Sequence, residues 1–227
     1  MVIIAEINQK DWFDYVVGTL SAFGSLATAG AFIYIFRQEK LARVQQFENN
    51  FFQLLNLHNQ ITTDLQKDGE IFVRAVANIR GIFIDGKDDG FGGTIPVAID
   101  LEDFDQVRAV IKDRYENYYY KDFDYRFNHY FRNLYHVFKF VYQSKAVSWE
   151  QKKQYAAIAR AQLSQKELFV IMFNAMIEDY GYPNFLFLIK KFKILDNFRD
   201  KEVEPHIVYD YFQKLQEDLE TPKSFRH

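Results

Sequence analysis

Cysteine is absent from the 227-residue sequence, which excludes a disulfide framework, a thiol nucleophile and cysteine-ligated metal sites. Proline and glycine are scarce, with 4 and 10 residues, and no stretch of useful length alternates polar and apolar residues as a strand would. An excess of one charge is lacking too. The 28 basic and 31 acidic side chains give a net charge of −3, which provides no bulk attraction to nucleic acid. These absences favour an all-α fold.

Aromatic residues are abundant, with 24 Phe and 15 Tyr, so the chain can bury a substantial core. Residues 37–68 contain neither Gly nor Pro and carry one apolar stripe at helical spacing, which predicts a long helix. A second helix is expected over 70–84, followed by a mobile loop over 85–96. Asp100 is expected to cap a helix that begins at 101. The pairs Ser148 with Gln151 and Ser164 with Glu167 fit capping boxes. Helices are therefore expected from about 149 and about 165, and then over 184–198 and 205–219.

Residues 15–36 contain no charged side chain. At about 1.5 Å rise per residue, a helix of this length matches a hydrocarbon core of roughly 30 Å. We therefore predict a single transmembrane helix over 15–36 that continues into a cytoplasmic helical bundle. The alternative is a buried helix in a soluble assembly.

The charges that flank this run indicate an orientation. Arg37, Lys40 and Arg43 follow it, whereas acidic residues dominate before it. The positive-inside rule then places residues 1–14 outside and residues 37–227 in the cytoplasm. The expected location is the inner (cell) membrane of a bacterium, and the lipid bilayer is the first expected partner.

Small residues recur three or four positions apart within the run, and such spacing lets helices approach closely. We expect them to support association with further copies of the chain or with a partner helix. They are Gly18, Ser21, Gly24, Ser25 and Thr28.

Arg132 and His136 lie four residues apart in the aromatic segment 115–142. The pair resembles the Arg and His of HEPN-type ribonucleases, in which the arginine stabilises phosphate charge and the histidine moves a proton. Only three residues separate the two here, which departs from that family's pattern. The alternative is an ion-paired arginine and a histidine packed in the core. These two residues are weak catalytic candidates, and the protein is more plausibly not an enzyme.

The remaining polar residues favour structural roles. Aromatic side chains at helical spacing are more often core than a platform for bases, so direct nucleic-acid binding is not expected. His58 lies on the apolar stripe and is interpreted as a hydrogen-bonded core histidine rather than a metal ligand. Arg160 is expected to pair with Glu167 across a helix break, and the alternative is that these polar residues mark a functional pocket. No pattern predicts a metal site or a cofactor.

Three segments together resemble the putative phage abortive infection proteins (AbiC-like): 36–61, 129–141 and 155–195. The resemblance implies antiviral defence, in which an infected bacterium stops growing or dies before phage is released. It implies no established catalytic mechanism. The small-residue run, the basic flank and the lack of catalytic spacing favour a toxin-like effector that works as a homo-oligomer or with a sensor protein such as a reverse transcriptase nucleoprotein. The rival functions are a membrane-anchored HEPN-like ribonuclease and a non-catalytic scaffold that recruits a defence enzyme. The family-like residues are Phe47, Phe51, Phe52, His58, Tyr130, Arg132, Tyr135, Arg160, Gln162, Ser164, Glu167 and Asn174.

Overall fold

A computed structural model of the protein describes residues 3–67, 69–84, 87–88, 94–95, 103–116, 120–199 and 206–226. The chain divides into two units, residues 1–49 and 50–227, and each is described by itself. Helix α1 (Ile3–Lys67) supplies the whole of the described first unit and the beginning of the second. The predicted divisions of the chain at residues 14 and 36 stay predictions.

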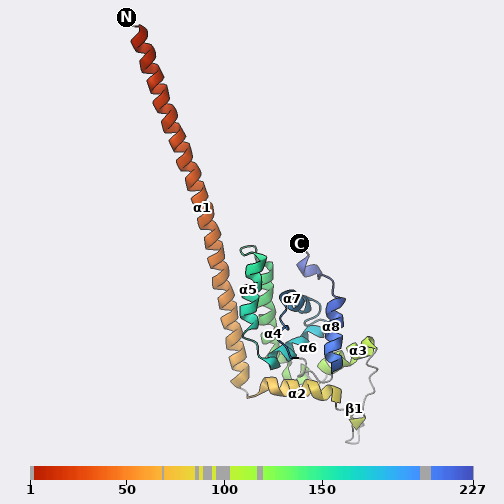
Figure 1. The fold of residues 1–227 in the computed structure, drawn as a ribbon. Coiled ribbons are helices and arrows are strands. Elements are labelled where there is room, and N and C mark those ends of the chain that lie inside the picture. Colours follow the sequence, from red (N-terminus) through yellow and green to blue (C-terminus); the bar gives the residue numbers. More distant parts are fainter. Residues whose placement is uncertain are drawn as a thin grey trace. The chain divides into compact units, whose positions relative to one another are not determined.

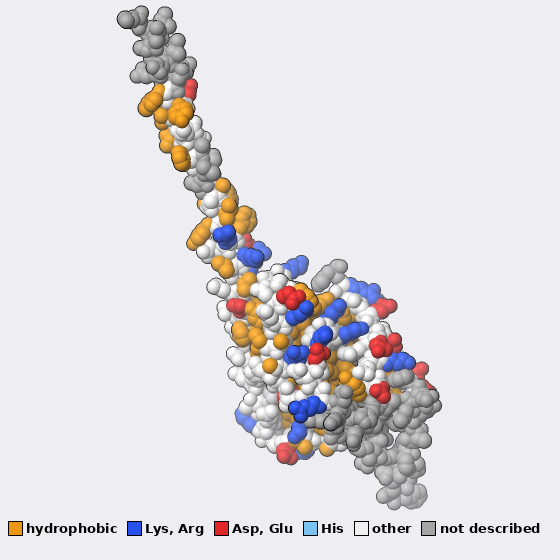
Figure 2. All heavy atoms as spheres, viewed as in Figure 1, with side chains coloured by type: hydrophobic (Ala, Val, Ile, Leu, Met, Phe, Trp, Pro, Cys, Tyr) orange, Lys and Arg blue, Asp and Glu red, His pale blue; other side chains and the backbone are white. Residues whose placement is uncertain are grey.

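The described part of the first unit is a helix, and many of its large apolar side chains lie in solvent (Figure 2). Trp12, Phe23 and Phe36 are 65, 72 and 66 % exposed. Among the residues that the structure describes, no helix combines the length and the apolar character needed to cross a bilayer. The transmembrane helix predicted over 15–36 finds no support in that result and stays a prediction. Several side chains of that run, including Ser25, lie outside the described residues.

The second unit is helical in nearly all of its described part (Figure 1). After α1 come α2 (Ile71–Ile84), α3 (Phe104–Arg114), α4 (Tyr120–Gln143), α5 (Trp149–Arg160), α6 (Gln165–Met176), α7 (Asn184–Phe192), α8 (His206–Glu217) and the 3₁₀ turn η3 (Lys223–Phe225). Two short strands, β1 (Lys87–Asp88) and β2 (Thr94–Ile95), pair antiparallel with Lys87 opposite Ile95. This ladder was not predicted, because a loop was expected there. The all-α class is confirmed.

Helix α6 lies at the centre of the core. It packs against α2, α7 and α8, and all its residues from Glu167 to Met176 are buried. A helix that is apolar on every side must be enclosed by others, which explains its place. Helix α4 packs against α5 and α7 and buries one face, so its aromatic run is core, as predicted. That face comprises Phe127, Tyr130, Phe131, Leu134, Val137, Phe138 and Val141.

Both predicted capping boxes are present. The Ser148 hydroxyl accepts from the Gln151 N–H, and the Gln151 side chain accepts from the Ser148 N–H. Ser164 and Glu167 repeat this arrangement at the start of α6. The sequence predicts these capping boxes because each one satisfies two amide N–H groups that the start of a helix leaves unpaired.

Two predicted helix boundaries are wrong. Helix α3 begins at Phe104, where the Asp103 carboxylate accepts from the N–H groups of Asp105 and Gln106 at 3.0 and 3.2 Å. Asp100, the expected cap, lies outside the described residues. Helix α7 ends at Phe192 rather than 198, because Lys193 adopts the left-handed conformation with φ of 53°.

Candidate functional site

Tyr130, Glu167 and Ser164 form a polar network between α4 and α6, in which Tyr130 and Glu167 are buried and Ser164 is exposed. The Tyr130 hydroxyl donates to Glu167 Oε1 at 3.0 Å. Glu167 Oε2 accepts from the Ser164 N–H at 2.9 Å and from its hydroxyl at 2.7 Å. Only 3 % of Glu167 is exposed. The carboxylate therefore caps its own helix and also joins that helix to α4, which satisfies a group that would be costly to bury alone.

His58 of α1 lies against this network. Its ring centroid is 4.9 Å from that of Tyr130, and only 2 % of the residue is exposed. Neither ring nitrogen has a hydrogen-bond partner among the described residues. Burial lowers the pKa of His58 to about 4, because a buried imidazolium would lose its hydration. The ring is therefore neutral at pH 7. His58 is buried as predicted, but the hydrogen bond predicted for it is absent among the described residues.

A second polar contact joins α6 to the end of α3. The Asn174 Nδ2 donates to the Tyr115 hydroxyl at 3.1 Å, and both residues are almost fully buried. Gly181 approaches α6 at the same level. A Cβ on Gly181 would lie 2.5 Å from the Asn174 carbonyl oxygen and 2.6 Å from the Ala175 Cα. Only glycine fits this close approach, a role that the sequence did not reveal.

Tyr115 and Asn174 also line a pocket of about 380 Å³. We call it the Arg132 pocket, and its lining consists of Tyr115, Asn128, Phe131, Arg132, Tyr135, Asn174, Asp179, Tyr180, Asn184 and Phe185. Its volume lies within the range of small-molecule sites. The predicted family-like residues Arg132, Tyr135 and Asn174 are thus brought to one place from two helices.

Arg132 supplies the cation of this pocket. Its guanidinium donates to Asn128 Oδ1 at 3.4 Å, and the residue is exposed. Amide groups of three asparagines and the rings of three tyrosines complete a surface that is rich in hydrogen-bonding groups. Such a surface suits a polar partner better than an apolar one.

His136 lies one turn beyond Arg132 and is not part of the pocket lining. It is exposed, and its pKa is lowered by partial burial and then by the charges of Lys139 and Arg132. The structure thus gives the two catalytic candidates different surroundings, and their catalytic role stays a prediction.

Arg160 does not pair with Glu167 as predicted. Its Nη1 donates to the Lys193 carbonyl at 2.8 Å and so satisfies a carbonyl at the end of α7. Glu167 is committed to Ser164 and Tyr130 instead. Gln162 is exposed. Sequence reasoning passed over Gln165, which donates to the Asn197 carbonyl and accepts from the Arg199 N–H.

The aromatic family-like residues of α1 differ in burial. Phe51 is fully buried and contacts the Tyr155 ring edge-on at 5.1 Å, whereas Phe52 is 45 % exposed. Phe47 belongs to the first unit. The predicted association residues Gly18, Gly24 and Thr28 are exposed on α1, and their role stays a prediction. No cluster of three potential His, Asp or Glu ligands occurs among the described residues.

Comparison with known proteins gives a family match for part of the chain. Neither the curated proteins nor the solved structures give a match to the chain. Residues 122–203, which run from α4 past the end of α7, match the family described as "Putative phage abortive infection protein". The matched region holds Tyr130, Ser164 and Glu167 and all but one residue of the Arg132 pocket. The resemblance predicted from segments 129–141 and 155–195 is confirmed over the matched residues, whereas segment 36–61 lies outside the match and stays a prediction.

Proposed function

We propose that the protein is a membrane-anchored effector of phage defence that stops the growth of an infected bacterium. The observation that carries this proposal is the family match over residues 122–203. The matched helices contain both the Tyr130–Glu167–Ser164 network and the Arg132 pocket. The network can hold α4 and α6 in a fixed arrangement, and the pocket can receive a partner.

The exposed apolar side chains of α1 support the anchor. Leu20, Phe23 and Phe32 are 65, 72 and 57 % exposed, and the run 15–36 carries no charge. Exposed apolar surface of this extent on one helix is costly in water, and lipid or another helix would cover it. The basic residues after the run favour an inner-membrane protein with its N-terminus outside and the second unit in the cytoplasm.

We infer that the second unit keeps the anchor inactive, alone or with a sensor partner, until infection releases it. Released copies would then cluster through the small residues of the run and disturb the membrane or arrest growth. A sensor such as a reverse transcriptase nucleoprotein would supply the signal. The Arg132 pocket is the contact that we assign to that partner, because its guanidinium and amides offer hydrogen bonds at the surface.

The anchor is tested by placing charges in the uncharged run. Phe23→Arg adds a cation near the centre of the run, where it costs roughly 2.5–3.5 kcal/mol, and Ile33→Arg adds a second cation nearer the end, where snorkelling makes the cost smaller. We expect the double variant to leave the membrane fraction and to lose protection against phage. Leu57→Arg, at a 46 % exposed position of the second unit, is the matched control and should retain both. Wild-type protein that is washed from membranes without detergent would exclude the anchor.

The mode of action is tested in infected cells with a dye that reports membrane potential. Loss of potential before phage release supports membrane disturbance. Growth arrest with the potential intact would exclude it. Arg132→Ala should abolish protection without changing the stability of the protein, whereas Lys166→Ala, at an exposed position of α6, should not. Equal protection by both variants would remove the pocket from the proposal.

A further inference from the structure

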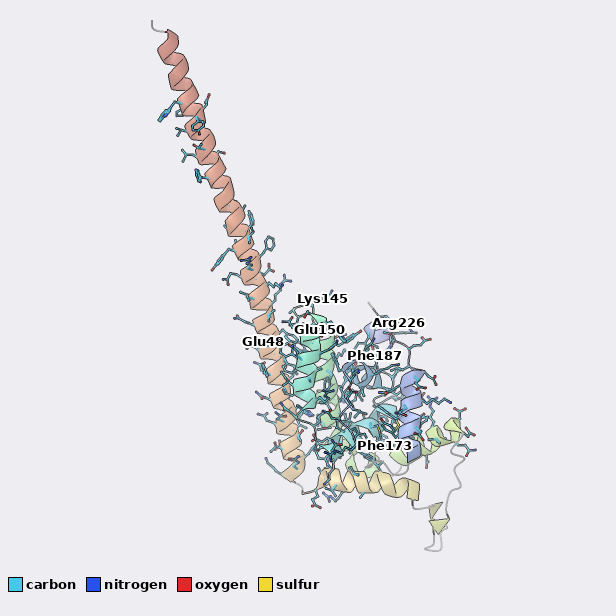
Figure 3. All side chains as sticks on the ribbon, in the orientation of Figure 1. Glu48, Lys145, Glu150, Phe173, Phe187 and Arg226 are labelled. Carbon is cyan, nitrogen blue, oxygen red and sulfur yellow. The ribbon has the colours of Figure 1, made fainter. Side chains whose placement is uncertain are left out.

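The turn between α4 and α5 borders a second hollow of about 380 Å³, at the end of the second unit where Figure 3 labels Lys145 and Glu150. We call it the lysine hollow. It is lined by Tyr142, Gln143, Ser144, Lys145, Trp149, Lys152 and Lys191. Three lysines and no carboxylate are therefore among the described residues that line it.

Two of the three lysines are held in place by contacts with their neighbours. Lys152 Nζ donates to the Tyr142 carbonyl at 2.6 Å and lies 5.9 Å from the centroid of the Tyr142 ring. Lys191 Nζ lies 5.5 Å from the centroid of the Phe187 ring. Neither contact neutralises an ammonium charge, so positive potential remains in the hollow. Glu150, the nearest acidic residue in sequence, forms an ion pair with Lys153 at 3.0 Å.

An aromatic ring stands at the edge of this charged hollow. Trp149 is 40 % exposed, and one face stacks on Phe192 with 5.6 Å between the ring centroids. A fixed, half-exposed tryptophan beside lysines is the combination that favours the interface between water and lipid, where the ring is partly buried and its N–H stays wet.

The chain also enters the second unit beside α5. Phe51, two residues into this unit, contacts Tyr155, which lies between one and two turns along α5 from Trp149. The second unit therefore begins next to the helix whose first turn borders the lysine hollow. The inference rests on the proposed function, because it requires the anchor to lie in a bilayer.

We propose that the lysine hollow binds the phosphate headgroup of an anionic membrane lipid. Three ammonium groups match the negative headgroup, and Trp149 contacts the adjacent interface. Each lysine near an anionic bilayer strengthens binding by about fivefold. Two lysines together would therefore contribute about 25-fold.

The test uses Trp149 as the reporter, since the chain contains only one other tryptophan. The full-length Trp12→Phe protein is placed in nanodiscs of neutral lipid, or of neutral lipid with one part in three phosphatidylglycerol, each carrying a spin label on a headgroup. We expect at least twofold stronger quenching of Trp149 in the anionic discs. Lys145→Gln with Lys191→Gln should remove this difference, and Lys152 is kept because it also binds a helix carbonyl. The matched control neutralises Lys112 and Lys166, two exposed lysines elsewhere in the unit. This control should retain the difference in quenching between anionic and neutral discs.

Equal quenching in neutral and anionic discs would overturn the proposal. Inorganic phosphate or glycerol phosphate, titrated into the protein in detergent, should leave Trp149 emission unchanged up to about 1 mM. A shift at lower concentration would indicate a free-phosphate site and would also overturn it. A protein that fails to enter nanodiscs contradicts the anchor alone. In that case, co-sedimentation of the protein with anionic vesicles still tests the lysine hollow. Salt-sensitive binding whose affinity falls about 25-fold in the same double variant would support the proposal, and the absence of such binding would overturn it.

Discussion

His58 makes the second unit sensitive to acid. The pKa of its imidazole is about 4 in the folded protein, against 6.5 in an unfolded chain. Between these values the unfolded state binds more protons, so the free energy of unfolding falls as the pH is lowered from 6.5 toward 4. A change from pH 7.5 to pH 5 should cost about 2 kcal/mol through this one residue, and the full difference of pKa corresponds to about 3 kcal/mol.

The substitution His58→Leu isolates this contribution. Leucine fills a similar volume and removes two buried nitrogens that have no hydrogen-bond partner among the described residues. We expect the variant to be at least as stable as the wild type at pH 7.5, because it relieves an unpaired polar group. It should lose about 2 kcal/mol less than the wild type on transfer to pH 5.

Urea unfolding of the full-length protein in a nonionic detergent measures this difference, followed by Trp149 emission in a Trp12→Phe background. Other titrating groups are common to both proteins, so they cancel in the comparison. His129→Leu, at an exposed position of α4, is the control and should behave as the wild type. Equal losses of stability for wild type and His58→Leu would refute the assignment of this acid sensitivity to His58.

The polar network and the close approach at Gly181 give three further predictions for the same unfolding assay. Tyr130→Phe should cost about 1 kcal/mol, because Glu167 keeps its bonds to Ser164; an unchanged midpoint would mean that this bond contributes nothing. Ser164→Ala should cost about 1 kcal/mol through loss of the helix cap, and a cost below 0.3 kcal/mol would contradict that role. Gly181→Ala should cost about 1–3 kcal/mol, because its Cβ would meet backbone atoms of Asn174 and Ala175 that cannot move alone. If Gly181→Ala were as stable as the wild type, the chain around residue 181 would have to move away from α6 at no cost.

Much of the local structure was determined by the sequence alone. The two capping boxes each depend on residues three positions apart, so no distant contact was needed to predict the starts of α5 and α6. The aromatic run of α4 predicted a buried face because its period is that of a helix. The same reading placed Asp100 at the start of α3, where Asp103 caps instead, since several acidic residues compete and spacing alone does not choose among them.

Tertiary structure decided which polar residues meet. Glu167 lies 37 positions from Tyr130, and Arg160 lies 33 positions from Lys193, so no local pattern could select these partners over the predicted Arg160–Glu167 pair. The Arg132 pocket and the lysine hollow likewise combine side chains from separate helices. Helical periodicity fixes which face of an element is buried, whereas packing between elements fixes which side chains share a cavity, and only the second of these builds a site.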